Sequence, residues 1–252
     1  MKLADWLEAQ PFALAMSSGF FSFFAHTGFL QSLTERRLAP TLVAGSSAGA
    51  LVGGAWAAGV ESRTLSERFQ ALRRDEFWDP APGAGLLAGR KFDRVLRDML
   101  PVTAMTETRV PVRISAFDIR RRATAVLHDT DLAHAIRASC AVPAMFHPVW
   151  IDHGPGDRRA YWDGGILDRP GLAGVPVGDR VLFHHIVSKS PWRAKPPAPP
   201  RRDGMVTLMI DGLPRSGPFR LDAGVRALGL AREATKRALD APIVDGVVRV
   251  ST

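Results

Sequence analysis

The sequence has 252 residues, of which 46% are apolar, and a formal net charge of +8. A chain of this length and apolar content can bury a substantial core, so we predict one domain over residues 1–252. The single cysteine, Cys140, excludes an intramolecular disulfide framework, no cysteine–histidine cluster has zinc spacing, and no apolar run reaches the roughly 20 residues of a membrane span, so we expect a soluble, cytoplasmic protein.

Apolar patterning alternates between strands and helices along the chain. The segments predicted as strands are, in order, residues 12–16, 42–44, 112–117, 123–128, 181–187 and 206–210. The segments predicted as helices are residues 25–37, 48–58, 64–74, 92–100, 132–139 and 222–239, the last closing the chain. Residues 79–91 and 189–203 are predicted surface loops, because they are rich in proline or glycine. This alternation predicts an α/β fold with a mainly parallel central sheet between helical layers.

A serine stands between glycines where the second predicted strand meets the next predicted helix, in the sequence AGSSAG. A nucleophile elbow has this construction: a strand, a tight turn of small residues around the serine, and a helix whose first N–H groups face the reacting atoms. Gly45 and Gly49 leave room for the turn, and the N–H of Ala48 directly follows the candidate nucleophile Ser47. The alternative is a flexible turn without a chemical role.

A serine nucleophile needs a base, and two kinds of candidate are present. A triad in the order Ser, acid, His leaves His184 and His185, in the strand segment VLFHHIVS. Neighbouring strand residues point to opposite faces, so at most one of these rings can face a site. The other candidate is Asp163 in WDGG, where Gly164 and Gly165 form a turn that can present a carboxylate at a strand end. An ordinary Asp-Gly hairpin turn is the alternative interpretation.

Together these segments resemble the patatin-like phospholipases. The resemblance is carried by AGSSAG, WDGG, ASCAVPAMFHPV and SSGFFSFFAHTGFLQSL, in the family's order and spacing over most of residues 12–187. It implies a patatin-like three-layer α/β/α sandwich and a hydrolase of fatty-acyl esters of lipids or phospholipids. In that family a dyad replaces the triad, so the resemblance implies Ser47 as nucleophile and Asp163 as base, with no metal or other cofactor.

The resemblance also implies an oxyanion hole in the loop after the first strand. Its candidate backbone donors are Ser18, Gly19 and Phe20, together with Ala48. The family's loop carries a run of three glycines, then an arginine and another glycine, whereas here phenylalanines follow Gly19, Ser22 replaces the later glycine and the arginine is missing. This departure favours an alternative function, a catalytically weak lipid-binding or scaffold protein.

The phenylalanines at positions 20, 21, 23 and 24 have two interpretations. They either line an acyl channel or form plain core at a strand–helix junction.

Arginine clusters at residues 120–122 and 193–202, the second beside Trp192, predict peripheral contact with an anionic membrane. The alternative is a solvated basic surface. No zinc-finger, RNP or basic-zipper pattern accompanies the clusters, so we expect no nucleic-acid partner.

Overall fold

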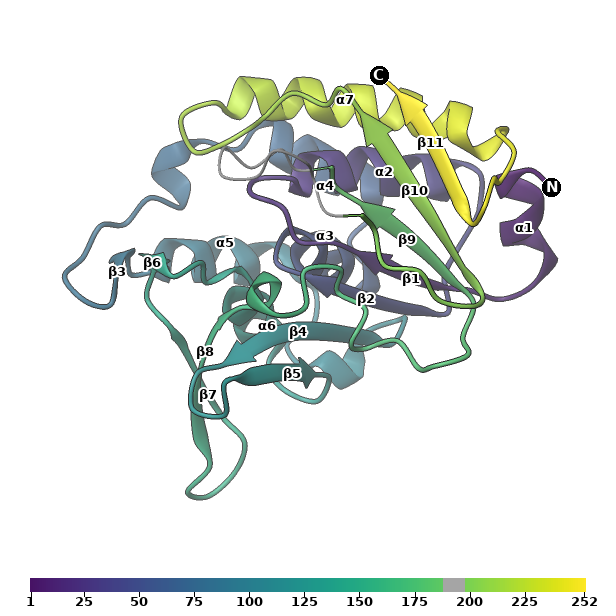
Figure 1. Cartoon of the computed structure of the whole chain (residues 1–252). Coiled ribbons are helices and arrows are strands. Elements are labelled where there is room, and N and C mark those ends of the chain that lie inside the picture. The colour runs from purple at the N-terminus through teal and green to yellow at the C-terminus, as the bar shows by residue number, and fades with distance from the viewer. Residues whose placement is uncertain (188–197) are drawn as a thin grey trace.

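The computed structural model describes residues 1–187 and 198–252, and within them a nine-stranded sheet forms the centre of the molecule (Figure 1). The inner strand β1 (Ala13–Met16) pairs in parallel with β2 (Leu42–Ser46) and with β9 (Val181–His185). β10 (Met205–Asp211) and β11 (Val247–Ser251) extend the sheet beyond β9, also in parallel. All residues of β1 are buried, because the sheet is covered on both faces, and this explains the unbroken apolar run.

The other half of the sheet becomes antiparallel. β4 (Val112–Asp118) pairs in parallel with β2, whereas β5 (Ala123–Leu127) and β8 (Arg158–Asp163) pair with β4 in antiparallel. The edge strand β7 (Val149–Asp152) is antiparallel to β8. The carboxyl ends of the parallel strands meet at one edge, where α/β proteins usually bind their ligands.

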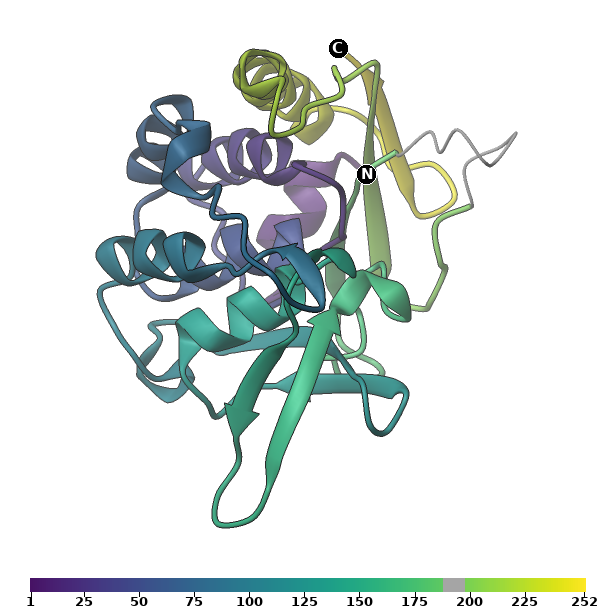
Figure 2. The ribbon, with the colours of Figure 1, turned by 90° about the vertical axis from the view of Figure 1, so that its left-hand side faces the viewer.

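The helices lie on one side of the sheet (Figure 2). They are α1 (Leu3–Ala9), α2 (Phe23–Glu35), α3 (Ala48–Ala57), α4 (Ser62–Gln70), α5 (Arg90–Met99), α6 (Leu132–Cys140) and α7 (Leu221–Leu239), with the short 3-10 turns η1 (Arg74–Glu76), η2 (Met105–Glu107) and η3 (Gly164–Ile166). Their apolar faces and one face of the sheet form the main core. α2 and α7 approach so closely that a Cβ at Gly28 would lie 2.1 Å from the carbonyl oxygen of Leu228.

The opposite face of the sheet has a smaller core. Ala13 and Ala15 of β1 contribute to it, and Leu172 and Val175 pack onto it from the segment that joins η3 to β9. Arg202 ties this segment down by donating hydrogen bonds to the carbonyl oxygens of Val175 and Pro176. The third layer of the sandwich is therefore a loop segment, which small sheet residues allow to lie close.

The predicted α/β class with a mainly parallel central sheet is confirmed. Every predicted strand and helix is present with shifted ends, but α7 does not close the chain, since β11 follows it. The predicted loop at residues 79–91 contains the three-residue strand β3 (Gly85–Leu87), which pairs with β6 (Ala144–Phe146). In the predicted loop at 189–203, residues 189–197 lie outside the described residues. No helix in the described part combines the length and apolarity of a membrane span.

Candidate active site

Ser47 occupies a sharp turn between β2 and α3. Its φ of 52° and ψ of −115° are unusual for a residue with a side chain, and such conformations cost about 1–3 kcal/mol and occur mainly at functional sites. The turn requires glycine on both sides: a Cβ at Gly49 would lie 2.1 Å from the carbonyl oxygen of Met16, and one at Gly45 would lie 2.6 Å from the backbone of Gly49. The backbone therefore has the strained geometry of a nucleophile elbow.

The end of α6 holds the backbone of Ser47 from both sides. The N–H of Ser47 donates to Ser139 Oγ at 2.7 Å, and Ser139 Oγ donates in turn to the carbonyl oxygen of Ser115 at 2.7 Å. The thiol of Cys140 donates to the carbonyl oxygen of Ser47 at 3.3 Å. Sequence reasoning did not assign this supporting role to Ser139, although the residue lies in the segment ASCAVPAMFHPV that carries part of the family resemblance.

Asp163 lies at the end of β8 with 7% of its surface exposed. Its Oδ1 accepts a hydrogen bond from the N–H of Gly165 at 2.7 Å, whereas Oδ2 has no hydrogen-bond partner among the described residues. Gly164 is needed here, because a Cβ would lie 2.1 Å from the carbonyl oxygen of Ser115. Burial raises the pKa of Asp163 to about 6, and the Ser47 hydroxyl and the Gly165 N–H partly oppose the rise. The Ser47 hydroxyl is thus near the carboxylate, although no hydrogen bond of normal geometry joins the two side chains.

The loop after β1 contains the candidate oxyanion donors. The N–H of Ser18 donates to the carbonyl oxygen of Arg169 at 2.8 Å, so the fold itself uses this group. The N–H groups of Gly19 and Phe20 make no hydrogen bond to a described residue, and Ala48 begins α3, where N–H groups lack helical partners. Gly19, Phe20 and Ala48 therefore stay candidates for the oxyanion hole, and Ser18 does not.

A cavity of about 510 Å³ joins these groups. Its lining includes Ser18, Gly19, Ser47, Ala48, Asp163, Gly165 and Arg169, and otherwise consists of Phe20, Phe21, Phe23, Leu51, Phe69, Leu72, Phe77, Phe92, Val95, Leu96, Met99, Cys140, Val142, Pro143, Met145, Phe146 and Ile166. The sequence left open whether Phe20, Phe21, Phe23 and Phe24 line an acyl channel or form core. The first three line this cavity, whereas Phe24 belongs to the core and packs against Gly224. The lining is mainly apolar and its few polar side chains include Ser47 and Asp163, which suits an acyl chain with an ester at its tip.

The candidate triad histidines do not line this cavity. His184 is buried, its Nδ1 lies 2.8 Å from Nδ1 of His26, and its ring stacks on Phe29. Burial lowers the pKa of His184 well below its ordinary value and that of His26 to about 4. His185 packs near Phe183, on the smaller core, and burial lowers its pKa to about 4. These rings are neutral parts of the interior.

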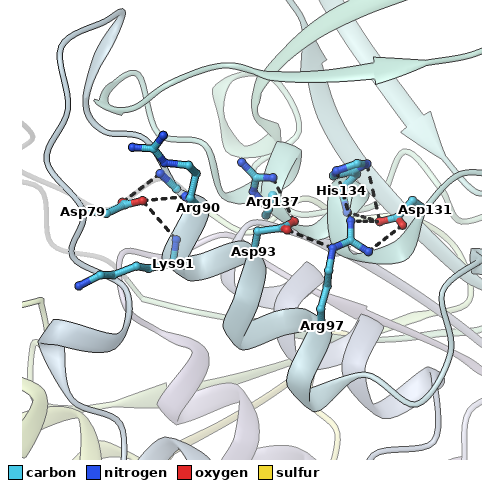
Figure 3. Close-up of polar contacts among 9 residues, drawn as sticks. Asp79, Arg90, Lys91, Asp93, Arg97, Asp131, His134 and Arg137 are labelled. Carbon is cyan, nitrogen blue, oxygen red and sulfur yellow. Dashed lines mark hydrogen bonds and ion pairs between the residues drawn. The ribbon is translucent and has the colours of Figure 1, made fainter.

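Asp79 fixes the start of α5, which forms one wall of the cavity. Its carboxylate accepts hydrogen bonds from the N–H groups of Gly89, Arg90 and Lys91, at 3.0, 2.7 and 3.2 Å (Figure 3). A carboxylate at a helix N-terminus satisfies free donors and complements the helix dipole. The segment that contains β3 is thereby tied to α5.

Ion pairs fix the same helix to α6. Asp93 pairs with Arg137 of α6 at 3.0 Å, and Arg97 pairs with Asp131 at 3.1 Å (Figure 3). Asp131 also accepts from the N–H of His134 and so caps α6. The cavity wall and the helix that supports Ser47 are thus joined on their outer side.

Comparisons with known proteins identify relatives for much of the chain. A family model described as patatin-like phospholipase matches residues 14–175. An uncharacterized NTE family protein of Mycobacterium bovis is 35% identical over 163 residues, which are 62% of this chain and 43% of that protein. Neuropathy target esterase of Drosophila melanogaster is 22% identical over 174 residues, which are 66% of this chain and 12% of that protein. This chain therefore spans less than half the length of these relatives.

The crystal structure of VipD from Legionella pneumophila has a similar fold. The two structures superpose with a TM-score of 0.55 at 13% sequence identity, over 91% of this chain and 67% of that one. The family model covers more than half of the sequence, from β1 to the segment on the smaller core, and includes both Ser47 and Asp163. The chain belongs to the patatin-like phospholipase family.

Proposed function

We propose that the protein is a serine acyl hydrolase that cleaves fatty-acyl esters of lipids or phospholipids. One observation carries the proposal: Ser47 on its strained turn and the buried Asp163, whose Oδ2 has no partner among the described residues, both line an apolar cavity of about 510 Å³. Membership in the patatin-like phospholipase family supports a lipid substrate.

The proposed reaction has two halves. Asp163 accepts the proton of Ser47 Oγ, which attacks the ester carbonyl, while the N–H groups of Gly19, Phe20 and Ala48 stabilise the oxyanion. The alcohol leaves with the proton that Asp163 returns, and an acyl-enzyme is formed on Ser47. Asp163 then takes a proton from water, the resulting hydroxide releases the fatty acid, and the proton returns to Ser47.

Activity is expected to rise with pH through about 6. Asp163 acts as a base only when ionised, and its pKa is raised from 3.8 to about 6, so activity is present above this pKa and lost as pH falls through it. The measurement is kcat/KM for a soluble short-chain ester across this range, where a decrease of about tenfold per pH unit is expected on the acid side. A profile that stays flat to about pH 4.5 would exclude Asp163 as the base.

Reaction with a fluorophosphonate tests the proposal directly, because this reagent phosphonylates only an activated serine. We expect stoichiometric labelling of the wild-type protein and none of Ser47→Ala. No labelling of a well-folded wild type would favour the alternative of a lipid-binding or scaffold protein, to which the altered oxyanion loop points. Labelling that depends on His184 or His185 and not on Asp163 would favour the triad.

The cavity also predicts a preference for long acyl chains. Each buried CH₂ contributes about 0.8 kcal/mol, so kcat/KM should increase about fourfold per added carbon until the cavity is full. Val95→Trp should remove this increase, because Val95 lines the cavity, whereas Arg94→Trp, on the exposed side of α5, should keep it. Identical chain-length profiles for both variants would place the acyl chain elsewhere.

Peripheral contact with an anionic membrane, at a cytoplasmic location, is part of the same proposal. The arginines at 120–122 are exposed on the turn between β4 and β5 and support it. Arg202 supports it less, since its guanidinium donates to backbone carbonyls. Trp192 and Arg193 lie outside the described residues.

A further inference from the structure

Exposed apolar side chains gather around the mouth of the cavity. Five large ones are Phe20, Leu86, Ile166, Leu167 and Phe219, with 56%, 51%, 41%, 57% and 69% of their surface exposed, and we call this set the mouth rim. Phe20 and Ile166 line the cavity itself. The others belong to segments at its opening: Leu167 follows Ile166, and Leu86 is in β3, beside β6, which adds two cavity residues. Isolated exposed apolar residues are ordinary, but such a group around a pocket marks a contact surface.

The loop between β10 and α7 completes the rim. Ser216 Oγ donates to the carbonyl oxygen of Phe21 at 2.9 Å, so this loop is held on the candidate oxyanion loop. Phe219 contacts Trp78 edge-to-face, with ring centres 5.4 Å apart. The loop after β1, Trp78 after η1 and the loop after β10 are therefore in contact with one another at the rim.

The charges beside the mouth rim are mainly positive. Arg74 lies 4.9 Å from the ring centre of Phe219, and Arg215 and Arg220 are exposed on the same loop. The nearby carboxylates already have partners: Asp79 caps α5 and Glu76 pairs with Arg68. The arginine turn at 120–122 follows β4 at the same carboxyl edge of the sheet.

We infer that the mouth rim is a docking surface for anionic lipid bilayers. Apolar side chains next to arginines suit the boundary between acyl chains and headgroups, where the apolar groups insert and the cations meet the phosphates. The bilayer is the fitting occupant because the rim opens into an apolar cavity, so an acyl chain passes from one to the other without crossing water. The inference rests on the proposed function in one respect, namely that the cavity takes an acyl chain. Binding of the rim to a bilayer does not depend on it.

The test is vesicle sedimentation with the Ser47→Ala protein, which separates binding from hydrolysis. The rim variant carries Leu86→Ser, Leu167→Ser and Phe219→Ser, none of which lines the cavity. The control carries Val177→Ser and Val244→Ser, which are 99% and 62% exposed and precede β9 and β11 at the opposite edge of the sheet. Vesicles are phosphatidylcholine with or without phosphatidylglycerol.

We expect the parent protein to bind phosphatidylglycerol vesicles and the control to bind equally well. The rim variant should bind at least about a hundredfold more weakly, since each lost side chain removes roughly a tenfold gain from burial. Replacing Arg74, Arg215 and Arg220 by glutamine should weaken binding to the anionic vesicles selectively, and salt should do the same.

Equal binding by the rim variant and its parent, or an equal loss in the control, would overturn the docking surface. Absence of binding to either vesicle would also overturn it and indicate a protein partner for the rim. Failure of the proposed function would look different. The wild-type protein would then bind vesicles, but it would neither hydrolyse a short-chain ester nor react with a fluorophosphonate. The same three rim substitutions in a protein that keeps Ser47 should leave hydrolysis of the soluble ester unchanged, and the urea unfolding midpoint of the rim variant should match that of its parent, which shows that the fold is intact.

Discussion

Replacing Asp163 by asparagine is expected to lower kcat about 10³- to 10⁴-fold while the protein stays folded. The amide keeps the shape of the side chain and an oxygen that can accept from the N–H of Gly165, now at 2.7 Å from Oδ1. It cannot take the proton of Ser47, so the nucleophile is not activated. The measurement is turnover of a soluble short-chain ester, with Asp152→Asn, an exposed carboxylate on β7, as the control.

Normal turnover by a folded Asp163→Asn protein would remove this residue from the mechanism. Loss of activity in His184→Ala or His185→Ala, with Asp163→Asn still active, would instead establish a triad. The double variant of Ser47→Ala with Asp163→Asn should be no slower than Ser47→Ala alone, because residues that act as one unit are not additive.

The same substitution should also change how stability depends on pH. The pKa of Asp163 is higher in the folded protein, at about 6, than its ordinary 3.8, so the folded state holds the proton more tightly and loses stability as pH rises between these values. The shift corresponds to roughly 3 kcal/mol at neutral pH. In urea unfolding, the free energy of unfolding of the Asn variant should therefore increase relative to that of the wild type between about pH 4 and about pH 7. If the difference in unfolding free energy between the two proteins did not change with pH, the ionised carboxylate of Asp163 would not be destabilised in the folded state.

Gly49→Ala is expected to destabilise the protein by about 3 kcal/mol or more and to reduce kcat/KM about a hundredfold. The added Cβ would lie 2.1 Å from the carbonyl oxygen of Met16, a backbone atom inside the sheet that cannot move aside cheaply. Relief of the clash requires α3 to shift, and Ser47 would move with it. Urea unfolding and ester turnover measure the two effects.

Gly229→Ala is the matched control, because it also places alanine in a helix. Outside its own helix backbone and chain neighbours, no atom of the described residues lies within 4 Å of the position of its Cβ, so only the helix preference of alanine remains, and a gain of roughly 0.5–1 kcal/mol is expected. If Gly49→Ala and Gly229→Ala had the same effect on stability and turnover, close packing at the nucleophile turn would not explain why residue 49 is glycine.

The elements of the fold were predictable where apolar period and length were unambiguous. β1 and α7 each show a clear pattern, and the structure has them within two residues of the expected ends. β3 was not predicted, because its three residues lie in a Pro- and Gly-rich segment and form a strand only by pairing with distant β6. Such short strands depend on tertiary contacts and leave no periodic signal.

The candidate site was predictable where its residues form local motifs. Ser47 and Asp163 stand in short glycine-rich segments, since tight turns restrict their neighbours, and the structure brings both to one cavity. The role of Ser139 was not visible, because its hydroxyl acts on residues 92 and 24 positions away. Similarly, the N–H of Ser18 was a reasonable donor in the sequence, and only the fold shows its bond to Arg169.

The buried pair His26 and His184 fixes the direction of the hydrogen bonds that lead to the candidate oxyanion loop. Both rings are neutral, and Nε2 of His26 must carry the proton to donate to the carbonyl oxygen of Ser17, 2.8 Å away. Nδ1 of His26 then accepts from Nδ1 of His184, whose Nε2 is left bare and has no partner among the described residues. Donation therefore runs one way, from β9 through α2 to the loop. A side chain at position 26 that can only accept would keep the bond from His184 but lose the one to the carbonyl oxygen of Ser17, two residues before Gly19.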